Sequence, residues 1–476
     1  LIRDPDVLDT WFSSGLWPFA TLGWPDKKDF VKKFYPTTVL VTGFDIIFFW
    51  VARMIMMTKH FMKEVPFKEV YITGLIKDEN GQKMSKSKGN ILDPIDLIDG
   101  VSLDDLLAKR TEGMMQPQLK EKIIKQTKKQ FPEGIESYGT DALRYTFYSL
   151  ASPGRDINFD IGRIKGYRNF CNKIWNAFRF IEMQVANHGY QTSEGSEDIL
   201  SDWMGSKIHQ TAQNCQTHIK QYRFDLASAE IYELIWSNFC DWYIEFSKVA
   251  IQKSDETSQI NNLIGNLIAN FYSILELLHP FMPFITEELS SKLADLAKVE
   301  KSGFLVEGGF EHARVSKEKT EQQLDEIINI ISSLRVLRAE NQNIKNEAFN
   351  LIVSNDLNSE MQSVISENEE IIAGIAKLDG IEFSDKIPAE SIEKTMNGYK
   401  LIIPLEGLID PEEEMMRLQK ELEDVENDIQ IISSKLANEQ FISKAPAAVV
   451  EKETAKVADA ESKKAMLEKS IAKLQP

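Results

Sequence analysis

A short loop of lysines and serines carries the clearest chemistry in this sequence. Lys83-Met84-Ser85-Lys86-Ser87 is followed at once by Lys88, so three ammonium groups and two hydroxyls lie within six residues. The loop follows a predicted strand at residues 70–76 and a turn at residues 78–81. Such a loop can wrap a polyphosphate and neutralise charge as pyrophosphate leaves. The alternative is a solvated basic loop, and a Walker loop is excluded because GxxxxGKS/T does not occur.

A carboxylate, Asp45, stands where another predicted strand gives way to a helix. The strand at residues 37–42 is short and β-branched, and an apolar helical run continues through Met57. Ligands usually bind at the carboxyl edge of such parallel strands. Asp45 could accept hydrogen bonds from ribose hydroxyls there, and Gly43 would let the backbone approach a ligand. Asp45 could also be a plain helix N-cap, and the two roles can coexist.

The chain that must position these residues is long and acidic. Its 476 residues are 43% hydrophobic and 27% charged, which predicts several domains with buried cores. The net charge of −18 argues against nonspecific nucleic-acid binding. Any contact with RNA must therefore come from local basic clusters.

Cysteine usage and hydropathy exclude several classes of protein. Three cysteines without a CxxC pair, Cys171, Cys215 and Cys240, indicate a reducing compartment and no four-cysteine zinc site. His209, Cys215 and His218 could share a helix face, but partly buried helical residues are favoured over metal ligands. No export signal is present, and polar residues interrupt the apolar stretch at residues 39–57, which argues against a membrane span.

Hydrophobic periodicity divides the chain into α/β, all-α and heptad segments. The α/β segment has only two strands and opens without an initiator methionine, so we expect its first half to be absent here. The predicted fold class is multidomain α/β plus all-α. The five expected domains are an α/β domain at 1–100, a connector at 101–165, a helical bundle at 166–321, a small α/β domain at 322–408 and an antiparallel coiled-coil arm at 409–476.

The lysine–serine loop resembles the KMSKS motif of class I aminoacyl-tRNA synthetases, and its flanks, residues 74–76 and Gly89-Asn90, resemble the class Ia subgroup. The resemblance implies that residues 1–100 are the second half of a Rossmann catalytic domain. It implies catalytic roles for Lys83 and Lys86 on the phosphates of ATP, with Lys86 stabilising the transition state most directly. It also implies an ATP site made by six residues, which are Gly43, Asp45, Met84, Ser85, Lys86 and Ser87. The reaction would be in-line attack of an amino-acid carboxylate on the α-phosphate, with Mg²⁺ held mainly by the ATP phosphates.

Two segments resemble the valine-specific family most closely, residues 6–14 and residues 43–54. That resemblance implies an amino-acid pocket walled by Trp11, Ile46 and Trp50, although both tryptophans could simply be core residues. Two indoles and one aliphatic side chain can form a rigid apolar slot, which excludes larger substrates but discriminates poorly against threonine. Hydrolytic editing would then be needed. The isoleucine-specific family is the second candidate, but its members commonly end in a cysteine-liganded zinc module, and this chain has no such cysteines.

The second half of the chain resembles the tRNA-binding parts of the same family. The resemblance implies that residues 101–165 contact the tRNA stem and that residues 166–321 bind the anticodon. A stretch without acidic residues carries five basic side chains that could bind RNA. These are Arg163, Lys165, Arg168, Lys173 and Arg179. The aromatic residues between them, Tyr167, Phe170, Trp175 and Phe178, are expected to be core residues more than stacking platforms.

The tail has an unbroken apolar spacing of three and four, which predicts a heptad helix. The pattern runs through Met415, Leu418, Leu422, Val425, Ile429, Ile432 and Leu436. It resumes less regularly after Pro446, so we expect a hairpin whose arms are each about 40 Å long. The resemblance implies that this arm rests on the outer corner of the tRNA. From the residues alone it could be a generic interaction coiled coil.

The resemblance implies valine, ATP and tRNA(Val) as partners, no membrane, a monomer and a cytoplasmic location, with no protein-bound zinc in this segment. A noncatalytic tRNA- or protein-binding module is the alternative from another functional class.

We expect that the full-length protein activates valine and that this chain by itself does not. No His-x-Gly-His motif occurs in the sequence, and in this family that motif binds the same ATP. The measurement is valine-dependent ATP–pyrophosphate exchange with the purified chain. Appreciable exchange would show that the ATP site is complete here.

Overall fold

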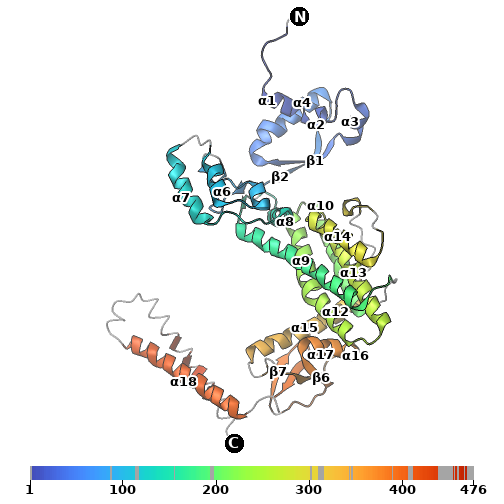
Figure 1. Cartoon of the computed structure of the whole chain (residues 1–476), viewed down its shortest axis with the longest axis vertical. Coiled ribbons are helices and arrows are strands. Elements are labelled where there is room, and N and C mark those ends of the chain that lie inside the picture. Colours follow the sequence, from blue (N-terminus) through green and yellow to red (C-terminus); the bar gives the residue numbers. More distant parts are fainter. Residues whose placement is uncertain are drawn as a thin grey trace. The chain divides into compact units, whose positions relative to one another are not determined.

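The computed structural model describes residues 3–85, 88–112, 117–154, 156–192, 198–300, 303–308, 316–341, 344, 347–388, 390–405, 411–437 and scattered positions between 454 and 468. The chain forms two compact units, Leu1–Leu324 and Asp325–Pro476 (Figure 1). Among the described residues, none of the helices has the length and apolar character that a membrane crossing requires.

The first unit begins with a parallel strand pair. Strand β1 (Thr37–Gly43) pairs with β2 (Phe67–Thr73), so that Gly43 lies opposite Thr73. Parallel strands need a crossover, and α4 (Ala52–Phe61) supplies it. Leu40, Val51, Met54 and Phe67 form the buried core beneath this crossover. The remaining helices here are α1 (Thr10–Gly15), α2 (Trp17–Ala20) and α3 (Lys28–Phe34).

The strand expected at residues 70–76 is divided into two. Strand β2 ends at Thr73, and β3 (Ile76–Lys77) pairs in parallel with β4 (Ile157–Asn158) instead of with β1. The chain changes partner at residues 74–75, where the Leu75 carbonyl accepts from the Ile157 amide (2.8 Å). The loop that follows is therefore attached to a different strand pair from the one that ends beside Asp45.

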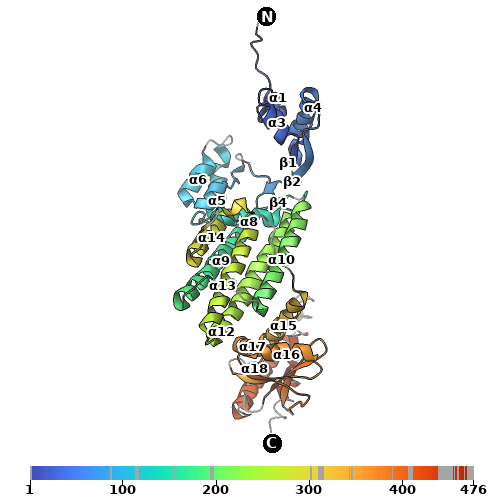
Figure 2. The same ribbon diagram turned by 90° about the vertical axis from the view of Figure 1, so that its right-hand side faces the viewer.

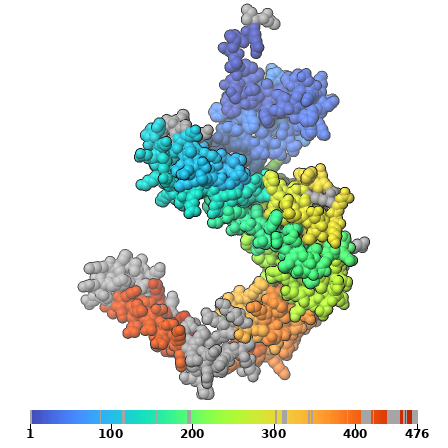
Figure 3. All heavy atoms as spheres, in the orientation of Figure 1, coloured from blue at the N-terminus to red at the C-terminus, as the bar shows by residue number. Residues whose placement is uncertain are grey.

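A helical layer supports this second strand pair. It consists of α5 (Pro94–Asp99), α6 (Leu103–Thr111), α7 (Lys120–Gln130) and α8 (Thr140–Leu150). Its core includes Leu97, Leu106, Phe131 and Leu143. In a space-filling view the side chains of α5–α7 form one continuous mass (Figure 3).

A bundle of long helices follows. The helices are α9 (Ile161–His188), α10 (Ile199–Lys220), α11 (Phe224–Glu233), α12 (Ile244–Lys253), α13 (Thr257–Leu278) and α14 (Pro283–Ala297). Helix α13 packs against both α9 and α10 (Figure 2). Its residues Ile264, Leu267, Phe271 and Leu278 are fully buried, as the 3.6-residue periodicity predicts.

Two side chains of α8 attach the connector to the bundle. The Asp141 carboxylate accepts from the backbone amides of Ile285 (2.7 Å) and Phe284 (3.3 Å) in the first turn of α14. The Arg144 guanidinium donates to the carbonyls of Pro280 (3.1 Å) and Phe281 (3.3 Å). Burial raises the pKa of Asp141, although the two amide donors act in the opposite direction. A negative charge at the start of α14 also suits the helix dipole.

The second unit contains a four-stranded mixed sheet in the order β6-β5-β8-β7. Helix α15 (Glu318–Glu340) begins in the first unit and continues into the second. The other elements of the second unit are β5 (Phe349–Val353), α16 (Ser359–Glu367), α17 (Glu369–Ala376), β6 (Leu378–Phe383), β7 (Ser391–Thr395), β8 (Lys400–Pro404) and α18 (Pro411–Leu436). The expected small α/β arrangement is therefore present. The buried Arg338 guanidinium secures it by donating to four carbonyls, those of Ile344, Glu347, Ala376 and Lys377.

The heptad segment forms a helix over Pro411–Leu436, as predicted. Val425 and Leu467 form a small buried cluster with Leu422, Ile429 and Ala460 packed against it. Lys464 pairs with Glu426 at 2.6 Å. Among the described positions, later residues therefore pack against earlier residues of the heptad helix.

Replacing Asp141 with alanine is expected to lower the free energy of unfolding by about 1–3 kcal/mol, because two amides at the start of α14 lose a buried charged acceptor. Asp141→Asn should lose less, since its amide oxygen still accepts one of the two bonds. Urea unfolding measures the effect, and Asp99→Asn on the exposed side of α5 is the matched control. An unchanged unfolding midpoint for Asp141→Ala would contradict this role.

Candidate functional site

The lysine loop and the carboxylate after β1 face each other. Lys83 Nζ lies 3.8 Å from Asp45 Oδ2, although 38 residues separate them in the sequence. Both side chains are open to solvent, with exposed fractions of 68% and 39%. An exposed ion pair of this length contributes little to stability. The pair marks a position, since a ligand bound beside these two groups would meet both an ammonium and a carboxylate.

Gly43 ends β1 directly beside Asp45. Its φ of −75° suits any residue, so the backbone conformation does not require glycine. The requirement is steric, because a Cβ at this position would lie 2.7 Å from Asp45 Oδ1. Asp45 itself lies in a 3-10 turn, Phe44–Ile46, and this turn has no side-chain cap among the described residues. The N-cap interpretation of Asp45 is therefore wrong, and its carboxylate is left for another use.

The three residues expected to wall an apolar slot lie on two neighbouring elements. Trp11 is on α1, whereas Ile46 and Trp50 belong to the segment between β1 and α4. Trp50 Nε1 donates to the Ser14 carbonyl (3.2 Å), and this bond ties the segment to α1. All three side chains are half-buried. Trp50 also packs against the core of Leu40, Val51, Met54 and Phe67, so a core role for this tryptophan stays open beside the pocket role.

The helix expected from this segment does not begin as an α-helix. A π-helical turn, Ile47–Val51, precedes α4 and carries Trp50. Such turns are frequent at functional sites because they change the direction in which a side chain points. The hydrophobic periodicity of the sequence did not predict this π-helical turn.

The base of the lysine loop is a closed turn. Gly81, with φ +72°, completes the turn, and its amide donates to the Asp78 carbonyl (2.9 Å). Lys77 and Lys83 form an antiparallel bridge across the base. Met84 packs against the core of the α5–α8 layer. Lys86 and Ser87, two of the expected ATP-site residues, lie outside the described residues.

The Asp78 carboxylate accepts hydrogen bonds from several residues of this turn and loop. Partial burial acts to raise its pKa, but hydrogen bonds from Asn90, Gln82 and Asn80 and the charge of Lys88 together hold that pKa below its usual value. The carboxylate is therefore ionised at neutral pH. Its interactions with the loop are charge-assisted for that reason.

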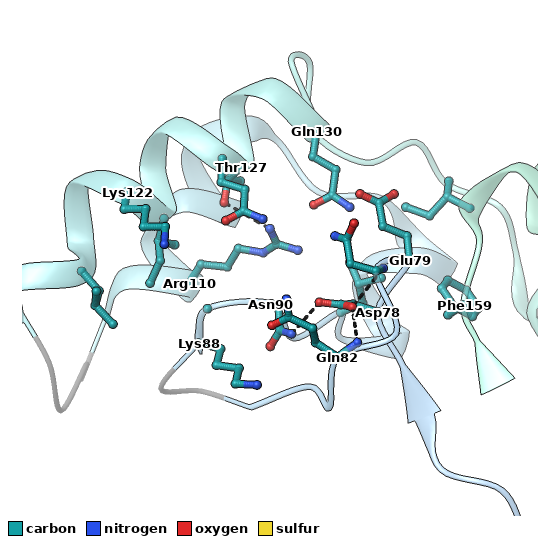
Figure 4. A pocket seen from close by; sticks show the side chains of 17 residues that line it. Asp78, Glu79, Gln82, Lys88, Asn90, Arg110, Lys122, Thr127, Gln130 and Phe159 are labelled. Carbon is teal, nitrogen blue, oxygen red and sulfur yellow. Dashed lines mark hydrogen bonds between the residues drawn. The ribbon is translucent and has the colours of Figure 1, made fainter. Parts of the chain in front are cut away.

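A cavity of about 390 Å³ lies between residues 78–82 and 88–90 on one side and α7 on the other (Figure 4). Arg110 enters it from α6 and is only 8% exposed. Its guanidinium donates to Thr127 Oγ1 (3.1 Å) and the Ile91 carbonyl (3.4 Å), and its Nε has no partner among the described residues. Burial lowers the pKa of Arg110. The sequence did not single out this residue, because a lone arginine in a helix gives no signal of burial.

The five basic residues expected to bind RNA all lie on α9, but they do not form one free patch. Arg168 pairs with Glu136 (3.2 Å), Lys173 with Asp241 (2.6 Å) and Arg179 with Glu182 (3.2 Å). Arg163 and Lys165 are exposed, and they form no ion pair within the part of the chain that the structure describes. The basic residues without an ion pair among the described residues therefore lie in the first two turns of α9.

The aromatic residues of α9 divide between core and surface. Phe170 and Phe178 are buried, as expected, whereas Trp175 is 36% exposed. Tyr167 is half-buried and lines a cleft of about 530 Å³ together with Arg163 and Tyr232.

His209, Cys215 and His218, which could have formed a metal site, all lie on α10. No group of three or more His, Cys, Asp or Glu side chains able to hold a metal occurs within the described ranges. Cys215 is buried and contacts the Ala227 carbonyl (3.5 Å). Burial raises the pKa of all three cysteine thiols, Cys171, Cys215 and Cys240, to about 12.

Three family models match the chain. Residues 1–160 match the class I tRNA synthetases (I, L, M and V), residues 201–353 match the anticodon-binding domain of tRNA ligase, and residues 410–475 match the valyl tRNA synthetase tRNA binding arm. The chain is also 47% identical over 460 residues to the valine–tRNA ligase of Francisella tularensis subsp. tularensis. That match covers 96% of this chain and 50% of the relative, so the chain spans about half the length of the curated relative it matches.

Similarity to solved structures is more distant. The LeuRS of Agrobacterium radiobacter K84, in a ternary complex with tRNA and LeuAMS, is 17% identical with a TM-score of 0.44, over 67% of this chain and 34% of that one. The methionyl-tRNA synthetase of Mycobacterium tuberculosis, in complex with methionyl-adenylate, is 19% identical with a TM-score of 0.42, over 57% of this chain and 47% of that one.

Proposed function

The chain belongs to the class I tRNA synthetases, and we propose that the complete protein is a valine–tRNA ligase that activates valine with ATP and transfers it to tRNA(Val). The identity of 47% to a valine–tRNA ligase over nearly the whole chain supports this choice, as does the match to the valyl arm. Both favour valine over isoleucine. The match of residues 1–160 to a synthetase family disfavours a noncatalytic binding module.

The observation that carries the proposal is the approach of Lys83 to Asp45 across 3.8 Å. In adenylate formation the α-phosphate is attacked in line by the carboxylate of the amino acid. Such a reaction needs positioning and charge stabilisation more than a nucleophile from the protein. Asp45 would accept hydrogen bonds from the ribose hydroxyls, and Lys83 with Lys86 would neutralise the phosphates. Mg²⁺ would arrive bound to those phosphates.

The side chain of valine would lie against Trp11, Ile46 and Trp50. The bond from Trp50 to Ser14 holds the segment carrying two of these walls against the helix carrying the third. A rigid apolar slot excludes isoleucine by overlap, but it admits threonine, which has nearly the same shape. We therefore propose that the complete protein also edits threonine.

The helical bundle and the heptad arm would bind tRNA(Val). Arg163 and Lys165 are the strongest candidates among the five basic residues of α9, because the other three are paired with carboxylates. Residues 411–436 and their packed partners would form a coiled-coil arm on the tRNA surface. We propose that the protein is a cytoplasmic monomer.

Replacing Lys86 with alanine in the complete protein is expected to lower valine-dependent ATP–pyrophosphate exchange by about 100-fold or more, because a preorganised charge on the departing phosphates is lost. Lys83→Ala should lower it less. The matched control is Lys59→Ala, at an exposed lysine on α4. Unchanged exchange in Lys86→Ala would remove the basis of the proposal.

Replacing Gly43 with alanine should raise the KM for ATP by about tenfold, because the new methyl group displaces the Asp45 carboxylate that binds ribose. The φ of −75° accommodates alanine, so folding should be retained. Gly166→Ala on α9 is the control, since its Cβ would meet nothing within 4 Å. A normal KM for ATP in Gly43→Ala would argue against the assigned role of Asp45.

A further inference from the structure

The two ends of the lysine loop are joined by one side chain, Asn90. We propose that Asn90 is a positioning residue that, through Asp78, holds the loop in the conformation that presents Lys83 to the nucleotide. This inference rests on the proposed function and adds to it a residue that touches neither ATP nor valine. We call the pair of Asp78 and Asn90 the clasp.

The side-chain oxygen and the side-chain nitrogen of Asn90 each form a hydrogen bond. Its Oδ1 accepts from the Ser85 amide at 2.9 Å, and its Nδ2 donates to Asp78 Oδ2 at 2.8 Å. A longer contact of 3.4 Å joins Nδ2 to the Lys83 carbonyl. One side chain thus binds the turn before the loop and two backbone positions within it. A primary amide accepts with its oxygen and donates with its nitrogen, which suits both contacts.

Asp78 in turn anchors the clasp to the turn. While Oδ2 accepts from Asn90, Oδ1 accepts from the amides of Gln82 (2.7 Å) and Asn80 (3.1 Å). Both oxygens are therefore engaged, and the ionised carboxylate strengthens all three bonds. The antiparallel bridge between Lys77 and Lys83 also holds the backbone of Lys83, the first lysine of the loop, against the strand before the turn.

The clasp is supported from behind by α6 and α7. Arg110 donates to the carbonyl of Ile91, the residue after Asn90 (3.4 Å). Gly89, with φ +63°, packs against Ile123 so closely that a Cβ would lie 2.7 Å from it. The side chains of Asp78 and Asn90 meet at the cavity in front of Arg110 (Figure 4). The loop end at Asn90 is therefore fixed to a packed helical layer.

The consequence is a preordered loop. A loop of lysines and serines has few apolar groups with which to hold itself, so ordering it on ATP binding would consume binding energy. The clasp orders the base of the loop beforehand. Breaking it should weaken productive ATP binding and expose the lysines to proteolysis, without affecting the bundle or the second unit.

A charge swap tests the clasp in the complete protein. Asn90→Asp places two carboxylates against each other and should lower kcat/KM for ATP in valine-dependent exchange by about tenfold or more. Asp78→Asn leaves two amides and should lower it by several-fold. In the double variant the carboxylate now at position 90 accepts from the Ser85 amide and from the side-chain amide now at position 78, whose oxygen still accepts from Gln82. The double variant should therefore return to within about threefold of the wild type, with only the long bond to Lys83 lost.

Limited trypsin digestion supplies a readout that does not depend on catalysis. Cleavage after Lys83, Lys86 or Lys88 should accelerate in Asn90→Asp and return toward the wild-type rate in the double variant. Asn80→Asp is the matched control, because it adds the same charge to the same turn on an exposed side chain. Both its kcat/KM and its cleavage rate should stay close to the wild type.

The outcomes are distinguishable. The clasp is refuted if Asn90→Asp behaves like the wild type in both assays, or if the double variant is as impaired as the two single effects multiplied. Should Asn90→Asp fail to fold, Asn90→Ala replaces it, with faster cleavage and lower kcat/KM expected and unchanged values refuting the clasp. If the wild-type protein shows no valine-dependent exchange, the proposed function fails, whereas the digestion still decides the clasp.

Discussion

The parallel register of β1 and β2 is the constraint on which the candidate site depends. Because Gly43 lies opposite Thr73, both strands end at the same edge of the sheet. The chain leaving β1 places Asp45 there, and the chain leaving β2 soon enters the lysine loop. The approach of Lys83 to Asp45 (3.8 Å) depends on this common edge and also on the pairing of β3 with β4, which carries the base of the lysine loop. A slip of one residue would turn every side chain of the strand to the other face.

The described residues at the two ends of the lysine loop are held by contacts with their surroundings. Its residues are charged or small, and Met84 is the described loop residue that packs against a hydrophobic core. The change of strand partner at residues 74–75 attaches the loop base to β4 and to the layer of α5–α8. Buried Arg110 and the Asp78–Asn90 pair then connect the base to that layer. Polar bonds of this kind are strongest where water is partly excluded.

Free basic charge is limited on the first helix of the bundle. In a chain of net charge −18, three of the five basic side chains considered on α9 are paired with carboxylates, which leaves Arg163 and Lys165 without an ion pair among the described residues. Asp141 and Arg144 have a different task, since both are used to attach α8 to the turn before α14 and to its first residues. The charges of these two side chains are therefore used to bind backbone groups of residues 280–285.

The sequence by itself determined the features that are encoded locally. The heptad spacing of residues 411–436, the periodicity of α13, the strand after residue 36 and the order of lysines and serines at 83–87 are all properties of neighbouring residues, and family resemblance rests on such segments. Only the tertiary structure decided which strand pairs with which beyond Thr73, that a π-helical turn carries Trp50, that Asp45 faces Lys83 instead of capping a helix, and that Arg110 is buried behind the loop. Each of these depends on packing partners that are distant in sequence, and local propensities contain no information about such partners.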